Sequence, residues 1–211
     1  GLSVVLDELE RRKLLENAWV FVTSDHGESL GEHDRYRHRN SLDEPATRIP
    51  LIVRGPGLSA GETNEALVQL VDVFGYLARS AGLPVEPDLD AREFGARRGV
   101  IIEHRPGPQG RLPSSYPRGD LSALIEWPHK FVEGPHVAST LFDLSADPGE
   151  SMNLIEVETE RAGRMRSLLR QLLPKLDGLG PQLVVESTLM LGSNSLMAAT
   201  IGISFLTSRS C

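Results

Sequence analysis

The sequence contains very little cysteine. Among its 211 residues the single cysteine is Cys211, which is also the last residue. One cysteine excludes an internal disulfide, so no disulfide framework stabilises the fold. Lys and Arg number 22 against 29 Asp and Glu, which gives a formal net charge of −7. Without a basic excess, the composition gives no support to binding of nucleic acid or of an anionic membrane.

Long apolar runs, internal repeats and glycine-rich phosphate loops are also lacking. Residues 189–206 are interrupted by Gly, Ser, Asn and Thr, so we expect no membrane-spanning helix there. The first residues show no signal-peptide pattern, and the chain opens within an amphipathic helix, as a piece of a longer chain would. Periplasmic, secreted and cytoplasmic locations therefore stay open, and so does the oligomeric state.

One stretch organises the predicted fold. Trp19-Val20-Phe21-Val22 is an uninterrupted apolar run that ends at Thr23-Ser24. A run of this kind is typical of a strand buried on both faces of a parallel sheet. Asp25, His26 and Gly27 follow where this strand would end. In open α/β sheets ligands bind beyond the carboxyl ends of the strands, so the sequence predicts a site here.

Asp25 and His26 place a carboxylate oxygen and an imidazole nitrogen side by side, and both are common metal ligands. Gly27 would allow a sharp backbone turn that lets the two side chains converge. The alternative is a polar turn in which Asp25 accepts hydrogen bonds from loop N–H groups.

The remaining pattern predicts an α/β fold: part of a mainly parallel sheet flanked by helices, then a small α+β subdomain with an antiparallel sheet. We expect a strand at residues 51–53, a third strand at 67–71, and a helix that begins at Asp72 as N-cap and ends at Gly82. Residues 123–127 and 130–132 predict a hairpin, and Met165, Leu168, Leu169 and Leu172 predict a helix. The predicted units are residues 1–88, residues 89–177, and an unassigned, disordered tail at residues 178–211.

Several ordered blocks resemble the sulfatase family of the alkaline-phosphatase superfamily. They are Thr23-Ser24-Asp25-His26-Gly27, Leu30-Gly31-Glu32-His33, Arg48-Ile49-Pro50-Leu51 and Gly82-Leu83-Pro84. Residues 141–154, with Asp147-Pro148-Gly149-Glu150, are similar to a closing segment that recurs in the same family. The resemblance runs from about Leu6 to about Leu154.

The resemblance implies roles for individual residues. Asp25 and His26 match two metal ligands of the family, and the metal it implies is Ca²⁺, with Mn²⁺, Mg²⁺ or Zn²⁺ as alternatives because histidine is unusual for Ca²⁺. His38 lies twelve positions after His26, where the family carries a Lys or His that touches the sulfate or the leaving oxygen. His33 would line the pocket mouth, and Arg48 would face the sulfate. The alternatives are that His38 is a solvated loop residue, that His33 is a structural histidine, and that Arg48 pairs with a local carboxylate.

The family's other site residues are not found. Its nucleophile is a formylglycine made in a Cys/Ser-x-Pro-x-Arg motif, and its first metal ligands are paired aspartates near the N-terminus; neither pattern occurs in these 211 residues. The implied function is that of a metal-dependent sulfatase portion, a hydrolase of small-molecule or carbohydrate sulfate esters that is inactive by itself. The alternatives are a phosphoesterase or phosphonate monoester hydrolase of the same superfamily, and a non-catalytic scaffold module.

Overall fold

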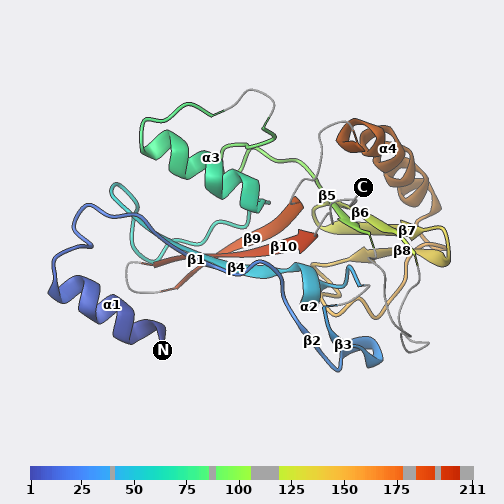
Figure 1. Cartoon of the computed structure of the whole chain (residues 1–211). Helices are drawn as coiled ribbons and strands as arrows, with labels where there is room; N and C mark the ends of the chain where they lie inside the picture. Colours follow the sequence, from blue (N-terminus) through green and yellow to red (C-terminus); the bar gives the residue numbers. More distant parts are fainter. Residues whose placement is uncertain (39–40, 86–88, 106–118, 178–183, 193–195, 205–211) are drawn as a thin grey trace, which may run out of the picture.

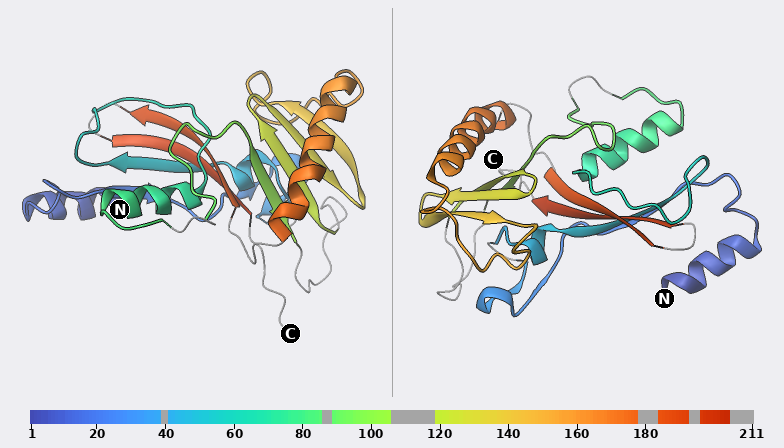
Figure 2. Two further views of the ribbon diagram at one scale, coloured as in Figure 1. Left: turned by 90° about the horizontal axis from the view of Figure 1, so that it is seen from above. Right: turned by 180° about the vertical axis from the view of Figure 1, so that it is seen from behind.

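The computed structural model describes residues 1–38, 41–85, 89–105, 119–177, 184–192 and 196–204, with side chains as far as residue 173. Two four-stranded sheets lie side by side, and a helix lies over one face of each (Figures 1 and 2). The first sheet has the strand order β1-β4-β10-β9, and the second has the order β5-β6-β7-β8. A two-stranded β2-β3 ribbon projects from the first unit.

The elements have the following bounds. The first unit contains α1 (Leu2–Arg11), β1 (Val20–Thr23), β2 (Ser29–Leu30), the 3-10 helix η1 (Glu32–Asp34), β3 (Tyr36–Arg37), α2 (Glu44–Thr47), β4 (Ile49–Arg54) and α3 (Leu70–Ser80). The second unit contains β5 (Val100–His104), β6 (Leu121–Glu126), β7 (His129–Gly134), β8 (Val137–Asp143) and α4 (Thr159–Asp177). The chain then returns to the first sheet as β9 (Val184–Gly192) and β10 (Leu196–Ser204).

The prediction of a mainly parallel sheet is wrong for the described residues, because every strand pair in them is antiparallel. Val20 of β1 lies opposite Arg54 of β4, and Thr23 lies opposite Leu51. The prediction that β1 is buried on both faces is also wrong, because β1 lies at the edge of the described sheet and Val20, Phe21 and Val22 are only partly buried. An uninterrupted apolar run predicts a strand but not its direction. Here the β1–β4 connection turns back through β2, β3 and α2 without crossing the sheet, so β4 runs opposite to β1.

The core of the first unit lies between β4 and α3. Ile49, Leu51 and Val53 alternate along β4 and are almost fully buried, and they pack with Val68 and with Val73 of α3. Trp19 and Phe21 cover the edge of this cluster. The period of two along β4 matches a strand with one face turned to the helix.

The second sheet is covered on both faces. On one face Leu124, Phe131 and Leu141 pack against Met165 and Leu169 of α4. The other face forms a separate cluster that includes Val100, Ile102, Leu121, Ala123, Ile125, Leu144 and, from the first unit, Leu42 and Leu67. The hairpin predicted at residues 123–132 is confirmed as β6 and β7.

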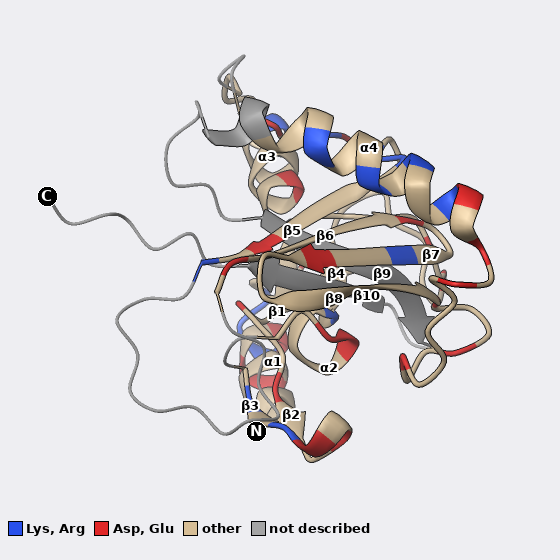
Figure 3. Ribbon diagram, turned by 90° about the vertical axis from the view of Figure 1, so that its right-hand side faces the viewer, with Lys and Arg blue, Asp and Glu red and all other residues tan. Residues whose placement is uncertain are grey.

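The exposed side of α4 carries basic residues that pair with acidic residues of the second sheet (Figure 3). Arg164 contacts Glu126 at 2.7 Å, and Arg170 contacts Glu133 at 2.9 Å. Both arginines are more than half exposed, so solvent screens each pair and its contribution to stability is small. The apolar stripe of α4 therefore supplies most of its attachment to the sheet.

The start of α3 differs from the prediction. Gln69 is the N-cap and Asp72 is the third helical residue, and together they form a capping box in which Asp72 Oδ2 accepts the Gln69 N–H at 2.8 Å. Residues 67–69 precede this helix instead of forming the body of a strand. The apolar residues between positions 67 and 73 are spaced in a way that suits both a strand and a helix. The capping box formed by Gln69 fixes the start of the helix.

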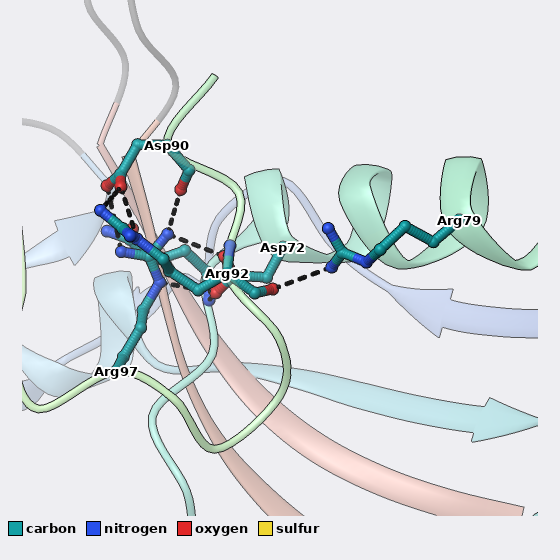
Figure 4. A network of polar contacts seen from close by, with 6 residues as sticks. Asp72, Arg79, Asp90, Arg92 and Arg97 are labelled. Carbon is teal, nitrogen blue, oxygen red and sulfur yellow. Dashed lines mark hydrogen bonds and ion pairs between the residues drawn. The ribbon is translucent and has the colours of Figure 1, made fainter. Parts of the chain in front are cut away.

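Asp72 also anchors the loop that follows α3 (Figure 4). The Arg97 guanidinium donates to both Asp72 carboxylate oxygens at 2.6 and 2.7 Å, and Arg97 also contacts Asp90 at 3.1 Å. The Arg92 N–H donates to Asp72 Oδ1 at 2.6 Å. The side chains of Arg97 and Asp72 are 7% and 1% exposed, so this bidentate pair is buried. Burial acts to lower the pKa of Arg97, but Asp72 and Asp90 outweigh it and raise that pKa above its ordinary value.

None of the helices in the described residues combines the length and the hydrophobicity that a membrane crossing requires. The described parts of residues 178–211 form β9 and β10 of the first sheet, in which β10 lies between β4 and β9. The boundary predicted after residue 88 falls next to residues 86–88, which lie outside the described residues.

Candidate functional site

The candidate site is the loop that follows β1, and its backbone rests on α2. The Gly27 N–H donates to the Ala46 carbonyl at 2.9 Å. A Cβ atom at Gly27 would lie 2.1 Å from the Pro45 carbonyl oxygen, far inside contact distance. Gly27 does not have the positive φ that a sharp left-handed turn needs. Glycine is therefore required here because the two backbones approach closely. The sharp turn that the sequence suggested is not the reason.

Replacing Gly27 with alanine is expected to lower the free energy of unfolding by about 1–3 kcal/mol, because the new methyl group must displace backbone. Chemical denaturation of the purified variant measures the change. Gly163→Ala is the matched control: it adds the same methyl group to α4 with nothing within 4 Å and should stabilise by about 0.5–1 kcal/mol. Equal effects of the two substitutions would contradict the close docking of the loop on α2.

Asp25 and His26 lie next to one another at the end of β1. His26 Nδ1 lies 2.7 Å from the Gly27 carbonyl oxygen. A carbonyl only accepts, so Nδ1 carries the proton and the neutral ring has its lone pair on Nε2. Nε2 lies 3.9 Å from Asp25 Oδ1, and the side chains are 24% and 68% exposed. The Nε2 lone pair of His26 and a carboxylate oxygen of Asp25 can therefore be directed at one solvent-accessible point.

The fold brings His38 onto His26. The two imidazole rings are tilted by 36° with their centroids 3.8 Å apart. The β2-β3 ribbon makes this contact, because it reverses the chain between the two histidines. His38 Nδ1 also lies 3.4 Å from Glu28 Oε2, with both side chains nearly half exposed. The sequence analysis did not single out Glu28 as a neighbour of His38; its signal is its place directly after Gly27.

The other two predicted residues lie farther along the same connection. His33 is exposed within η1, where it has a positive φ of 52°. Arg48 is half-buried and is the C-cap of α2, with its N–H donating to the Glu44 carbonyl at 2.7 Å. Both belong to the segment between β1 and β4, but the structure places neither in the His26–His38 ring contact.

Asp43 fixes the segment between β3 and α2. It pairs with Arg35, and its N–H donates to Ser41 Oγ at 3.0 Å. Burial acts to raise the pKa of Asp43, but the hydrogen bond with Ser41 and the positive charges of Arg35 and Lys130 outweigh it and hold that pKa below its ordinary value. Asp43 is therefore a charged anchor of the loop that carries His38.

Asp25 and His26 suit a divalent cation as part of a ligand set. Carboxylate oxygen fits Ca²⁺, Mg²⁺ and Mn²⁺, and imidazole nitrogen fits Mn²⁺ and Zn²⁺. In the part of the chain that the structure describes, no group of three or more His, Cys, Asp or Glu side chains is arranged to hold a metal ion. A cation at this point would therefore need ligands beyond these two residues.

Three comparisons with known proteins agree. A sequence model of the sulfatase family matches residues 1–83. The chain is 26% identical to arylsulfatase K of Xenopus laevis over 184 residues, which cover 82% of this chain and 34% of that protein. It is 28% identical to arylsulfatase K of Mus musculus over 167 residues, which cover 72% of this chain and 30% of that protein. The chain thus spans about a third of the length of these relatives.

The fold has solved counterparts. One is a structure in complex with its substrate D-glucosamine-2-N,6-O-disulfate, with a TM-score of 0.66, 24% identity, and coverage of 84% of this chain and 37% of the other. Another is a phosphonate monoester hydrolase of Agrobacterium radiobacter, with a TM-score of 0.61, 21% identity, and coverage of 84% and 38%. At these identities the likeness shows the fold. The match of the sulfatase family model to residues 1–83 and the similarity to arylsulfatases K confirm the resemblance drawn from the sequence blocks.

Proposed function

We propose that this chain is part of a metal-dependent hydrolase of sulfate esters, with its chemistry at the loop after β1. The observation that supports the proposal best is the contact between His26 and His38, whose rings lie 3.8 Å apart beside Asp25. This contact places Asp25 and His26, which are suited to metal binding, next to His38, which is suited to proton transfer, although the two histidines are twelve positions apart in the sequence. The sulfatase-family match over residues 1–83 contains the whole of this loop.

Asp25 and His26 would bind the cation. When bound, a divalent cation supplies positive charge that holds the sulfate oxygens and offsets the charge that develops as the ester bond breaks. His26 presents Nε2 for this task because the Gly27 carbonyl holds the proton on Nδ1. We propose Ca²⁺ as the cation, with Mn²⁺, Mg²⁺ and Zn²⁺ as alternatives that the same two donors would accept.

His38 would act on the leaving group. As a nucleophile bonds to sulfur and takes over the sulfuryl group, the bond from sulfur to the leaving oxygen breaks. A protonated His38 can then donate a proton from Nε2 to that oxygen, so that the product departs as a neutral alcohol. Glu28 Oε2 lies 3.4 Å from His38 Nδ1, so Nε2 is the ring nitrogen on the far side from Glu28. Arg48 and His33, on the same β1–β4 connection, are proposed to contact the sulfate and the pocket mouth.

The proposed substrate is a small-molecule or carbohydrate sulfate ester. One solved structure of similar fold holds a sulfated glucosamine as its substrate, and another is a phosphonate monoester hydrolase. A sulfate monoester and a phosphonate monoester both present a tetrahedral anion and one leaving oxygen. Phosphonate monoester hydrolysis is therefore the second candidate, and a direct comparison of the two substrates decides between them.

His38→Ala tests this function in the full-length gene product that contains these residues. Turnover of an activated aryl sulfate should fall about a hundredfold, because one positioned acid is lost. The melting temperature should change little, since the His38 side chain is 44% exposed. His136→Ala, an exposed histidine of the second unit, is the control and should leave turnover unchanged.

The substrates and the metal are tested in the same assay. Faster hydrolysis of an aryl phosphonate monoester than of the aryl sulfate by the unaltered protein would favour the second candidate. Unchanged turnover of His38→Ala would remove His38 from the mechanism. Absence of both activities, together with absence of divalent-cation binding, would favour a non-catalytic scaffold.

A further inference from the structure

We propose that Lys130, Glu44 and Glu150 form a positioning triad, through which the second unit holds the loop that carries Asp25 and His26. The triad fixes the position of α2, and α2 in turn holds the loop through its backbone contact with Gly27. Its consequence for catalysis rests on the function proposed above, whereas the mechanical coupling itself does not. Neither Lys130 nor Glu150 needs to touch substrate for this role.

The triad is a buried ionic cluster that joins distant parts of the chain. Lys130 Nζ lies 2.8 Å from Glu44 Oε1 and 2.9 Å from Glu150 Oε1. The three side chains are 0%, 8% and 2% exposed, in that order. The Glu44 N–H donates to Glu150 Oε2 at 2.7 Å, so Glu150 contacts both the ammonium group and the first residue of α2.

The strand geometry of β7 explains how a lysine becomes fully buried. Successive side chains of a strand point to opposite faces. Phe131 faces α4 and joins the cluster with Met165, so Lys130 faces the other way, toward α2. That face is also where Leu42 and Leu67 of the first unit pack against the second sheet.

A buried ionic cluster is weak evidence for added stability, because removing charges from water costs nearly as much as their attraction returns. Its better attested use is to fix one arrangement among several that an apolar contact would allow. Burial, with the nearby carboxylate of Glu44, raises the pKa of Glu150 above its ordinary value despite the opposing charge of Lys130. The cluster thus holds three ionisable side chains in one defined buried position, at a cost in desolvation free energy.

Glu150 has a second sign of constraint. Its φ is 52°, a left-handed conformation that few residues other than glycine adopt. Such a conformation persists where the surrounding contacts determine it. Here Glu150 closes the Asp147-Pro148-Gly149-Glu150 turn, with its N–H donating to the Asp147 carbonyl at 3.1 Å. The turn therefore aims the Glu150 carboxylate at α2, which gives the closing segment a role beyond its own sheet.

The helix α2 passes this constraint to the candidate site. It has four residues, too few for an isolated helix to hold its own shape, so its neighbours fix its position. Glu44 at its start binds the triad. Ala46, one half-turn later, accepts the Gly27 N–H at 2.9 Å, and the Pro45 carbonyl contacts Gly27 directly. A short stretch of α2 backbone and one hydrogen bond therefore connect the triad to Gly27, the residue after His26.

The coupling is tested by hydrogen exchange at Gly27, whose amide is held by Ala46. Peptides covering residues 24–31 of the full-length protein are followed by mass spectrometry, with fragmentation to resolve the Gly27 amide. In Glu150→Ala we expect exchange at Gly27 to become about tenfold faster or more, because a charged acceptor of the Glu44 N–H is lost. Glu150→Gln retains an acceptor for that N–H and should cause a smaller increase.

Met165→Ala is the matched control. Met165 is fully buried between α4 and the second sheet, on the side that faces away from α2. Its truncation destabilises the same unit through a cavity, without touching the triad. If a general loss of stability caused the exchange, Met165→Ala would accelerate Gly27 as much as Glu150→Ala does at an equal drop in melting temperature, and the proposal would be wrong.

The outcomes separate this proposal from the proposed function. Faster Gly27 exchange in Glu150→Ala but not in Met165→Ala supports the coupling, even in a protein that hydrolyses no sulfate ester. Unchanged Gly27 exchange in a folded Glu150→Ala overturns it, even in an active sulfatase. Should Glu150→Ala fail to fold, Glu150→Gln and Lys130→Met provide the same readout, and unchanged Gly27 exchange in both overturns the proposal.

Discussion

Replacing His26 with alanine in the full-length protein is expected to lower turnover of an aryl sulfate by about a thousandfold or more. A cation that offsets transition-state charge supplies several kcal/mol, and each 1.4 kcal/mol is about tenfold in rate. His26 is the nitrogen donor of the proposed pair, and its Nε2 faces Asp25 Oδ1 at 3.9 Å. The same substitution should weaken divalent-cation binding, measured by calorimetry on protein treated with a chelator.

The expected loss has to be separated from loss of folding. The His26 side chain is partly exposed, so its truncation should leave the melting temperature in the absence of metal nearly unchanged. Asp25→Ala should reproduce the weaker cation binding, and Asp7→Ala, which removes an exposed carboxylate of α1, should not. Full cation affinity in both Asp25→Ala and His26→Ala would show that the metal lies elsewhere.

Residues 1–211 by themselves are expected to give no measurable turnover of sulfate esters. The candidate site offers two ligands, whereas Ca²⁺ takes about six to eight oxygen ligands. No larger ligand cluster exists among the described residues, and the formylglycine motif implied by the family is not in the sequence. Without a nucleophile there is no covalent step to divide the barrier.

The assay uses purified residues 1–211 with Ca²⁺, Mn²⁺ or Mg²⁺ and an activated aryl sulfate. Arylsulfatase K of Xenopus laevis, of which this chain matches 34%, serves as the positive control for the assay. Circular dichroism establishes that the tested chain is folded, so that inactivity is not merely unfolding. Turnover comparable with that of the control would mean that a nucleophile lies within these residues.

The sequence by itself determined what depends on neighbouring residues. The apolar run at Val20–Val22 marked a strand, and the polar residues after it marked the candidate loop. The stripe of Met165 and Leu169 marked α4, and the two short segments at residues 123–127 and 130–132 marked the β6–β7 hairpin. The order of the sequence motifs resembled the sulfatase family, and a model of that family matches residues 1–83. Local periodicity and capping encode such features within a few turns or strand residues.

Only the tertiary structure decided which residues meet across the chain. The direction of β4 against β1, the contact of His38 with His26 and the pairing of Arg97 with Asp72 leave no periodic signal in the sequence. Lys130 is a charged strand residue, yet it is fully buried against Glu44, 86 positions away. The physical reason is that the cost of burying a charge depends on which opposite charges the fold brings to it, and that is a property of the packed chain.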